Sequence, residues 1–121
     1  MTLALLCVVT ALGGCATKPE SVLPAYVSEF MYQNLTCEQL AQEQARVQVA
    51  LMTAAAAQRT ARTHDTVGVI FLGLPVSSLS GSNQAAQIAQ LKGQLEAIDK
   101  AAIQKGCKLP VLPDPMAEPK T

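Results

Sequence analysis

The feature that most constrains the fold of this chain is a pair of cysteines, Cys37 and Cys107, at the ends of two predicted helices. Residues 36–39 read Thr-Cys-Glu-Gln, a capping box in which Thr36 is the N-cap and the glutamine bonds back to its backbone N–H. Residues 101–106 place a lysine in a last helical turn and a glycine at the left-handed position beyond it. One cysteine therefore opens a helix, and the other directly follows the end of a second helix.

If these helices fold back antiparallel, the start of the first lies beside the end of the second. The two sulfur atoms then come within reach, because a disulfide needs a Cα spacing of about 5.5 Å. The sequence predicts an all-α protein, an antiparallel helical hairpin over residues 36–107 that is stapled by a Cys37–Cys107 disulfide, with disordered termini. A length of 121 residues with balanced charge allows one small domain.

Two apolar stripes predict how the helices pack. The first helix, over about residues 37–62 or longer, carries a stripe of Leu40, Val47, Leu51 and Ala54. The second, over residues 83–105 with Ser82 as the expected N-cap, repeats apolar residues at spacings of three and four, the a/d pattern of a coiled coil: Ile88, Leu91, Leu95, Ile98 and Ala102.

The staple also predicts the register of the hairpin. With Cys37 facing Cys107, Val47 is expected to meet Ala97, and Leu51 to meet Gly93. A large residue would oppose a small one at both levels. This register offers a reason for a glycine inside a helix, which costs about 1 kcal/mol relative to alanine.

The chain opens with an apolar run that has the length of the hydrophobic region of a signal peptide. Residues 1–15 contain no Lys, Arg, Asp or Glu. The run is about half as long as the roughly 20 residues that a spanning helix needs. No basic residue precedes it, so the positive charge in front is the terminal amine or lies upstream of Met1. A buried helix of a cytosolic protein and a cleaved signal without lipid are the alternatives.

Residues 12–15, Leu-Gly-Gly-Cys, resemble the lipobox of bacterial lipoproteins. The resemblance covers about the first twenty residues. It implies that residues 1–14 are a signal peptide and that Cys15 carries the lipid, with palmitate-type acyl chains that hold the chain to a membrane. Ala16 follows the cysteine where an aspartate would favour inner-membrane retention, so the resemblance favours the outer membrane, facing the periplasm. The chain as a whole resembles small, uncharacterised helical lipoproteins of proteobacteria.

Between the lipid site and the hairpin, residues 15–35 are expected to form a lipidated tether and an aromatic segment. Residues 16–21 have the small, polar, proline-interrupted composition of a linker. Three of the four aromatic residues of the chain follow: Tyr26, Phe30 and Tyr32. They are expected to fold back as a lid over the stapled end, and the alternative is a segment that docks on a partner.

The most apolar stretch after the signal region is residues 66–76, which the register places beyond the paired helices. The first helix could continue to Leu74 and stop before Pro75, with the apolar surface buried by self-association or by folding back. The functional alternative is an interaction tip that contacts a membrane or a partner protein. The residues assigned to this tip are Val69, Ile70, Phe71, Leu72 and Leu74.

The sequence gives little support for catalysis, metal binding or nucleic-acid binding. The single histidine, His64, has no nucleophile at a suggestive spacing, and no His/Cys cluster remains once the cysteines are assigned. No cofactor site is predicted. Nine basic residues balance nine acidic ones, which removes the electrostatic case for nucleic acid.

The tail, residues 108–121, is rich in proline and is expected to be extended or disordered, as a passive end or a short docking peptide. These sequence features together predict two possible functions of different class. The first is a non-enzymatic envelope lipoprotein that binds an unknown envelope protein or itself, as a structural or accessory component. The alternative is a small lysis- or release-type lipoprotein that perturbs a membrane.

Overall fold

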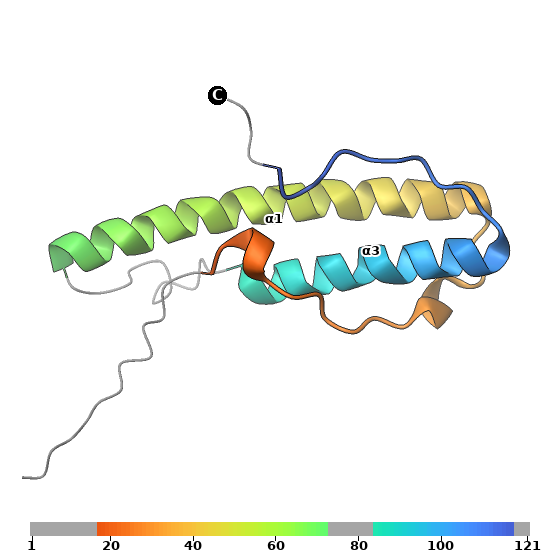
Figure 1. The fold of residues 1–121 in the computed structure, drawn as a ribbon, viewed down its shortest axis with the longest axis horizontal. Helices are drawn as coiled ribbons and strands as arrows, with labels where there is room; N and C mark the ends of the chain where they lie inside the picture. The colour runs from red at the N-terminus through yellow and green to blue at the C-terminus, as the bar shows by residue number, and fades with distance from the viewer. Residues whose placement is uncertain (1–16, 73–83, 118–121) are drawn as a thin grey trace, which may run out of the picture.

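Two long helices lie antiparallel and side by side in the computed structural model (Figure 1). The structure describes residues 17–72 and 84–117, with the backbone alone at position 62 and positions 64–72. The helices are α1, Cys37–Leu72, and α3, Ala85–Lys105. No strand occurs in the described residues. The predicted all-α helical hairpin is confirmed.

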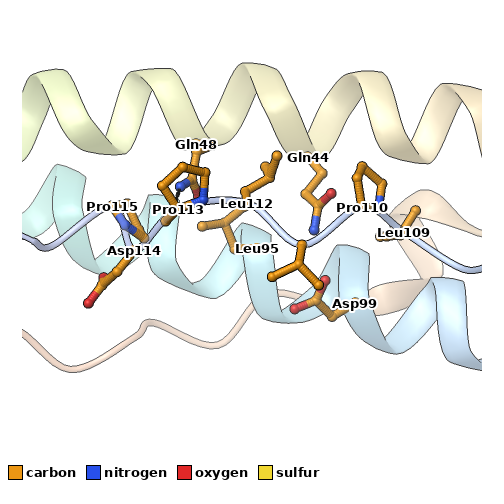
Figure 2. Close-up of a pocket in the computed structure, with 11 residues that line it drawn as sticks. Gln44, Gln48, Leu95, Asp99, Leu109, Pro110, Leu112, Pro113, Asp114 and Pro115 are labelled. Atoms are coloured by element: carbon orange, nitrogen blue, oxygen red, sulfur yellow. Dashed lines mark hydrogen bonds between the residues drawn. The ribbon is translucent and has the colours of Figure 1, made fainter.

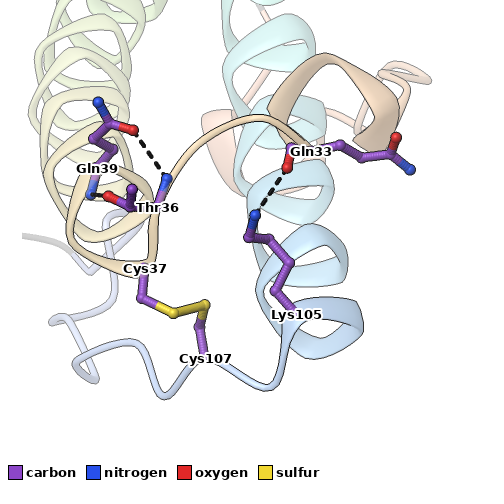
Figure 3. The surroundings of a disulfide bond; sticks show 6 residues. All are labelled: Gln33, Thr36, Cys37, Gln39, Lys105 and Cys107. Atoms are coloured by element: carbon purple, nitrogen blue, oxygen red, sulfur yellow. Dashed lines mark hydrogen bonds between the residues drawn. A yellow bond between two sulfur atoms is a disulfide. The ribbon is translucent and has the colours of Figure 1, made fainter.

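The capping box that begins α1 forms as predicted. The backbone N–H of Gln39 donates to Thr36 Oγ1 over 3.1 Å, and the N–H of Thr36 donates to Gln39 Oε1 over 2.9 Å (Figure 3). Each bond satisfies a backbone donor that a helix start leaves without a helical acceptor. The first residue of α1 is therefore Cys37, whose Cα lies 5.4 Å from that of Cys107 across a closed disulfide.

Local hydrogen bonds at the end of α3 fix the position of the second cysteine, Cys107, as the capping box does for Cys37. Gly106 takes the left-handed conformation, with φ of 71°, and its N–H donates to the carbonyl of Ile103. The N–H of Cys107 donates to the carbonyl of Ala102 over 2.9 Å. These two bonds are the Schellman pattern, which reverses the chain immediately after the helix. Both half-cystines are thus positioned by local helix-end chemistry.

The two apolar stripes form the core. Leu40, Val47, Leu51 and Ala54 of α1 are all buried, and so are Ile88, Ile98 and Ala102 of α3. Leu91 and Leu95 are partly buried and pack against these residues. Val47 and Ala97 lie in the same cluster, which agrees with the predicted register. The helix α3 begins at Ala85 after Gln84, later than expected, and Ser82 lies outside the described residues.

The segment that precedes α1 lies along α3 and contains two short 3-10 helices, η1 at Pro19–Ser21 and η2 at Glu29–Tyr32 (Figure 1). The N–H of Ala25 donates to the carbonyl of Ala89 over 2.8 Å. Near the staple, Lys105 Nζ donates to the carbonyl of Gln33 over 2.8 Å (Figure 3). The expected linker is therefore packed against the hairpin from position 17 onward.

The N-terminal segment, and not Leu51, is the reason for the glycine at position 93 of α3. A Cβ at Gly93 would overlap the carbonyl oxygen of Ala25 and lie 3.0 Å from Cγ2 of Val27. Leu51 packs in a cluster with Ala54 and Ile88. The predicted Leu51–Gly93 pairing is wrong as the reason for the glycine, because the close neighbour is the backbone of the N-terminal segment.

The prediction that Tyr26, Phe30 and Tyr32 form a lid over the stapled end is wrong for two of the three residues. Tyr26 is 83% exposed and Phe30 68% exposed, whereas Tyr32 is buried in the core cluster near the staple. Because side chains alternate along an extended chain, the packing of Val27 against the core directs its neighbour Tyr26 outward. Only one of the three aromatic residues therefore covers the hairpin.

The C-terminal segment is extended, as expected, yet it is docked on its own hairpin. Residues 108–117 run back from the staple along α1 (Figure 1). Leu109 and Met116 pack against the two core clusters, and Gln48 Nε2 donates to the carbonyl of Pro113. We call residues 108–117 the proline strap.

Candidate functional site

The predicted site residues fall in three places. Cys37 and Cys107 are joined at the stapled end. Residues 69–72 of the interaction tip belong to the last turns of α1, where the backbone is described. Cys15 and Leu74 lie outside the described residues. The structure therefore brings the disulfide residues together and leaves the lipid site and the tip as predictions.

The end of the hairpin that is opposite the staple is organised by Gln58, a fully buried side chain of α1. Its Nε2 donates to the carbonyl of Thr17 over 2.8 Å. Its Oε1 accepts from the backbone N–H of Gln84, the residue before α3, over 2.5 Å. One side chain thus joins α1, the start of α3 and the N-terminal segment. We call this junction the Gln58 clamp.

Two cations reinforce the clamp. Arg59 donates through Nη2 to Glu20 Oε1 and to the carbonyl of Met116, each over 2.6 Å. A hydrogen bond from its own backbone, and then the bond from Arg59, lower the pKa of Glu20. Lys92 Nζ donates to the carbonyls of Pro19 and Val22 over 2.7 and 2.6 Å, and burial lowers the pKa of Lys92.

The pairing of these cations with backbone carbonyls has a structural consequence. The carbonyls of Pro19 and Val22 accept from Lys92, and that of Met116 accepts from Arg59. Hydrogen bonds to charged groups are the stronger kind. Both ends of the described chain meet here, because Arg59 holds the N-terminal segment and the proline strap together. The clamp therefore fixes where the chain from Thr17 departs toward Cys15.

A hollow lies under the proline strap, between α1 and α3 (Figure 2). It has a volume of about 370 Å³, and its wall combines apolar residues of the strap with Gln44, Leu95 and Asp99. Burial raises the pKa of Asp99, and a hydrogen bond with Gln44 opposes that rise. The other carboxylate of the wall, Asp114, accepts from the N–H of Met116 over 2.8 Å.

The lining of this hollow offers few of the side chains that catalysis commonly uses. Asp114 is engaged in the turn of the strap, so Asp99 is the carboxylate left without a backbone donor, and the lining includes no Ser, Cys, His or Lys. A general acid–base mechanism or nucleophilic catalysis needs a second group within hydrogen-bond reach. Among the side chains that the structure describes, which leave out His64 and Asp65, no three of His, Cys, Asp or Glu gather as metal ligands would.

The sequence carries one sign of the clamp, although the clamp was not among the predicted sites. Gln58 continues the apolar stripe of α1, four residues after Ala54, so a polar residue stands where the pattern calls for an apolar one. A polar side chain in such a position must find hydrogen-bond partners when it is buried. Its partners belong to segments 26 and 41 residues away, which no local pattern could identify.

Replacing Gln58 by leucine is expected to lower the free energy of unfolding by about 2 kcal/mol. The variant keeps the size of the side chain but leaves the Thr17 carbonyl and the Gln84 N–H without their partner, and a buried polar group left unpaired costs about 1–3 kcal/mol. Denaturant unfolding followed by circular dichroism measures the change. Gln42→Leu, on the exposed face of α1, is the matched control, and equal losses in both variants would contradict the role of the clamp.

Neither described helix combines the length and the apolarity that crossing a bilayer requires. Comparisons of the chain with protein-family models, with curated proteins and with solved structures find no match.

Proposed function

We propose that this chain is a lipid-anchored, non-enzymatic component of the bacterial cell envelope, held to a membrane by acyl chains on Cys15. The observation that carries the proposal is the Cys37–Cys107 disulfide, which forms between the ends of two helices. Structural disulfides persist in oxidising compartments such as the periplasm and are rare in the cytosol. The lipobox-like residues 12–15 provide a route to that compartment and an attachment point.

The organisation of the described chain supports a structural or accessory role. A thin core, mostly of alanine, leucine, isoleucine and valine, is closed by a covalent staple, two packed flanking segments and a polar clamp. This arrangement stabilises a narrow rod and provides no paired catalytic groups in its described part. Ala16 after the lipid cysteine favours the outer membrane and the periplasmic face. Partners of this rod would be an envelope protein or a second copy of the chain.

One observation favours the alternative, a lipoprotein that perturbs a membrane. The helix α1 continues into the apolar residues 67–72 instead of ending at a polar turn. Expression in cells distinguishes the two functions. A membrane-perturbing protein releases periplasmic or cytoplasmic contents in proportion to its expression level, whereas an accessory component leaves the envelope sealed.

The anchor is tested by metabolic labelling with a radioactive fatty acid. We expect the label on the wild-type chain and its loss in Cys15→Ser, because the thiol is the acceptor of the diacylglyceryl group in bacterial lipoproteins. Cys7→Ser is the matched control, since it removes a cysteine from the apolar run and should leave the label in place. Label that persists on Cys15→Ser would exclude Cys15 as the lipid site.

A further inference from the structure

The Gln58 clamp places the lipid site close to one end of the hairpin. Thr17 is held against α1 by Gln58, and only Ala16 separates Thr17 from Cys15. Two residues of fully extended chain span about 7 Å. Wherever residue 15 lies, the acylated sulfur and the bilayer that holds its chains must therefore be within a short reach of the clamp.

The same end carries the apolar part of α1. Gln58 is bonded to Gln84, the residue before α3, so the clamp marks the level at which α3 begins. The helix α1 continues for fourteen residues beyond Gln58, to Leu72, which at 1.5 Å per residue is about 21 Å. Figure 1 shows this part of α1 extending past the beginning of α3. The extension is about three times longer than the tether that joins the clamp to the lipid.

The order of residues along the extension matches the layers of a bilayer. Residues 62–66 read Arg-Thr-His-Asp-Thr and span about 7 Å of helix. A headgroup layer is about 5–8 Å thick on each side of the hydrocarbon core. Residues 67–72 follow, without a charged or polar side chain among them, over about 9 Å. Amphipathic and interfacial segments bury apolar residues about 5–10 Å into this boundary.

We propose that the end of α1, residues 67–72, docks into the same leaflet that holds the acyl chains of Cys15, so that the hairpin stands on the membrane with its stapled end away from it. This inference rests on the proposed lipid anchor and names the partner of the interaction tip. The partner is the phospholipid bilayer rather than a second protein, because a tether of two residues leaves the tip no position far from that surface.

The absence of tryptophan from the chain gives a direct probe of this orientation. Phe71→Trp places a fluorophore in the docking segment with a conservative aromatic exchange, and Ile103→Trp places one at an exposed position near the staple. The protein is extracted from bacterial membranes, and intact mass reports its acylation and disulfide. It is then reconstituted into phosphatidylethanolamine–phosphatidylglycerol vesicles with brominated acyl chains. We expect quenching of most of the fluorescence of Phe71→Trp and none of that of Ile103→Trp.

Two outcomes overturn the inference while the lipid anchor stands. An acylated Phe71→Trp protein without quenching would show that the end of α1 stays out of the bilayer. Quenching of both variants would show that the hairpin does not stand on one end. Hydrogen exchange tests the docking without any substitution. We expect the amides of residues 67–72 to exchange more slowly in the acylated wild-type protein on vesicles than in the same protein in detergent-free solution after its acyl chains have been removed.

Failure of the anchor itself is separable from failure of the docking. If intact mass shows no acyl chains, the proposed function fails, and the docking is tested on residues 15–121, which keep every contact described between residues 17 and 117. Cys15 is the one free thiol of that chain, because Cys37 and Cys107 are paired. It can be coupled to a maleimide phospholipid, and the same quenching difference is then expected. Equal signals from the two coupled variants would overturn the docking.

Discussion

Replacing both Cys37 and Cys107 by serine is expected to lower the free energy of unfolding by about 4 kcal/mol. The disulfide closes a loop with a sequence separation of 70, and the chain-entropy relation for such a loop gives a loss of this size. Small domains have only about 5–15 kcal/mol of stability in total. The variant should therefore be partly unfolded near 37 °C. Thermal and denaturant unfolding followed by circular dichroism, with and without a reductant, measures the effect.

The staple has a stability role that the helix ends alone cannot replace. The capping box and the glycine cap together contribute about 0.6–3 kcal/mol, because each helix-end feature is worth about 0.3–1.5 kcal/mol. On residues 15–121 without acyl chains, Cys15→Ser is the matched control, since it removes a sulfur without opening the loop. Equal stability of the double serine variant and Cys15→Ser would contradict the prediction. Reactive thiols at both Cys37 and Cys107 in the native protein would contradict it too.

Gly93→Ala is expected to destabilise the protein by about 2 kcal/mol, although alanine is the better helix former. Helix propensity favours the alanine by about 1 kcal/mol. Against this, the new methyl would overlap the carbonyl of Ala25, a backbone atom that cannot rotate away. The N-terminal segment must then move, with loss of the hydrogen bond from Ala25 to Ala89 and of the packing of Val27. Overpacking of this kind costs about 1–3 kcal/mol or more.

The measurement separates the two competing effects. Ala57→Gly, at an exposed position in the interior of α1, reports helix propensity alone and should cost about 1 kcal/mol. In Gly93→Ala, hydrogen exchange of the Ala25 amide should become faster than the change in global stability explains, because the segment detaches locally. A Gly93→Ala protein that is more stable than wild type would mean that propensity wins and that the contact with residues 25–27 is soft.

The sequence by itself determined the features whose physics is local. The capping box of Thr36 and Gln39 and the left-handed Gly106 each involve residues within one helical turn, so their bonds follow from residue types and spacing. The apolar stripes also follow from helical periodicity, which depends on the chain alone. Together these features located both cysteines, and the disulfide and the hairpin came with them.

Only the tertiary structure decided where the two flanking segments pack and what holds them. Residues 17–35 and the proline strap have the composition of a linker and a tail, yet both are held by side chains far away in the sequence, such as Lys92 and Arg59. A bond between a cation and a backbone carbonyl is independent of the identity of the residue that supplies the carbonyl. The sequence of the linker or the strap therefore carries no sign of it.

The roles of Gly93 and Gln58 were decided at the same level. The role of each residue is set by backbone from other segments. For the glycine this is the carbonyl of Ala25, and for the glutamine these are the Thr17 carbonyl and the Gln84 N–H. A pattern of spacings marks such a residue as unusual for its position in a helix, but it does not identify the segment that fills the space or accepts the bond. That information exists only once the chain has folded, because the contact partners are brought together by the hairpin and its staple.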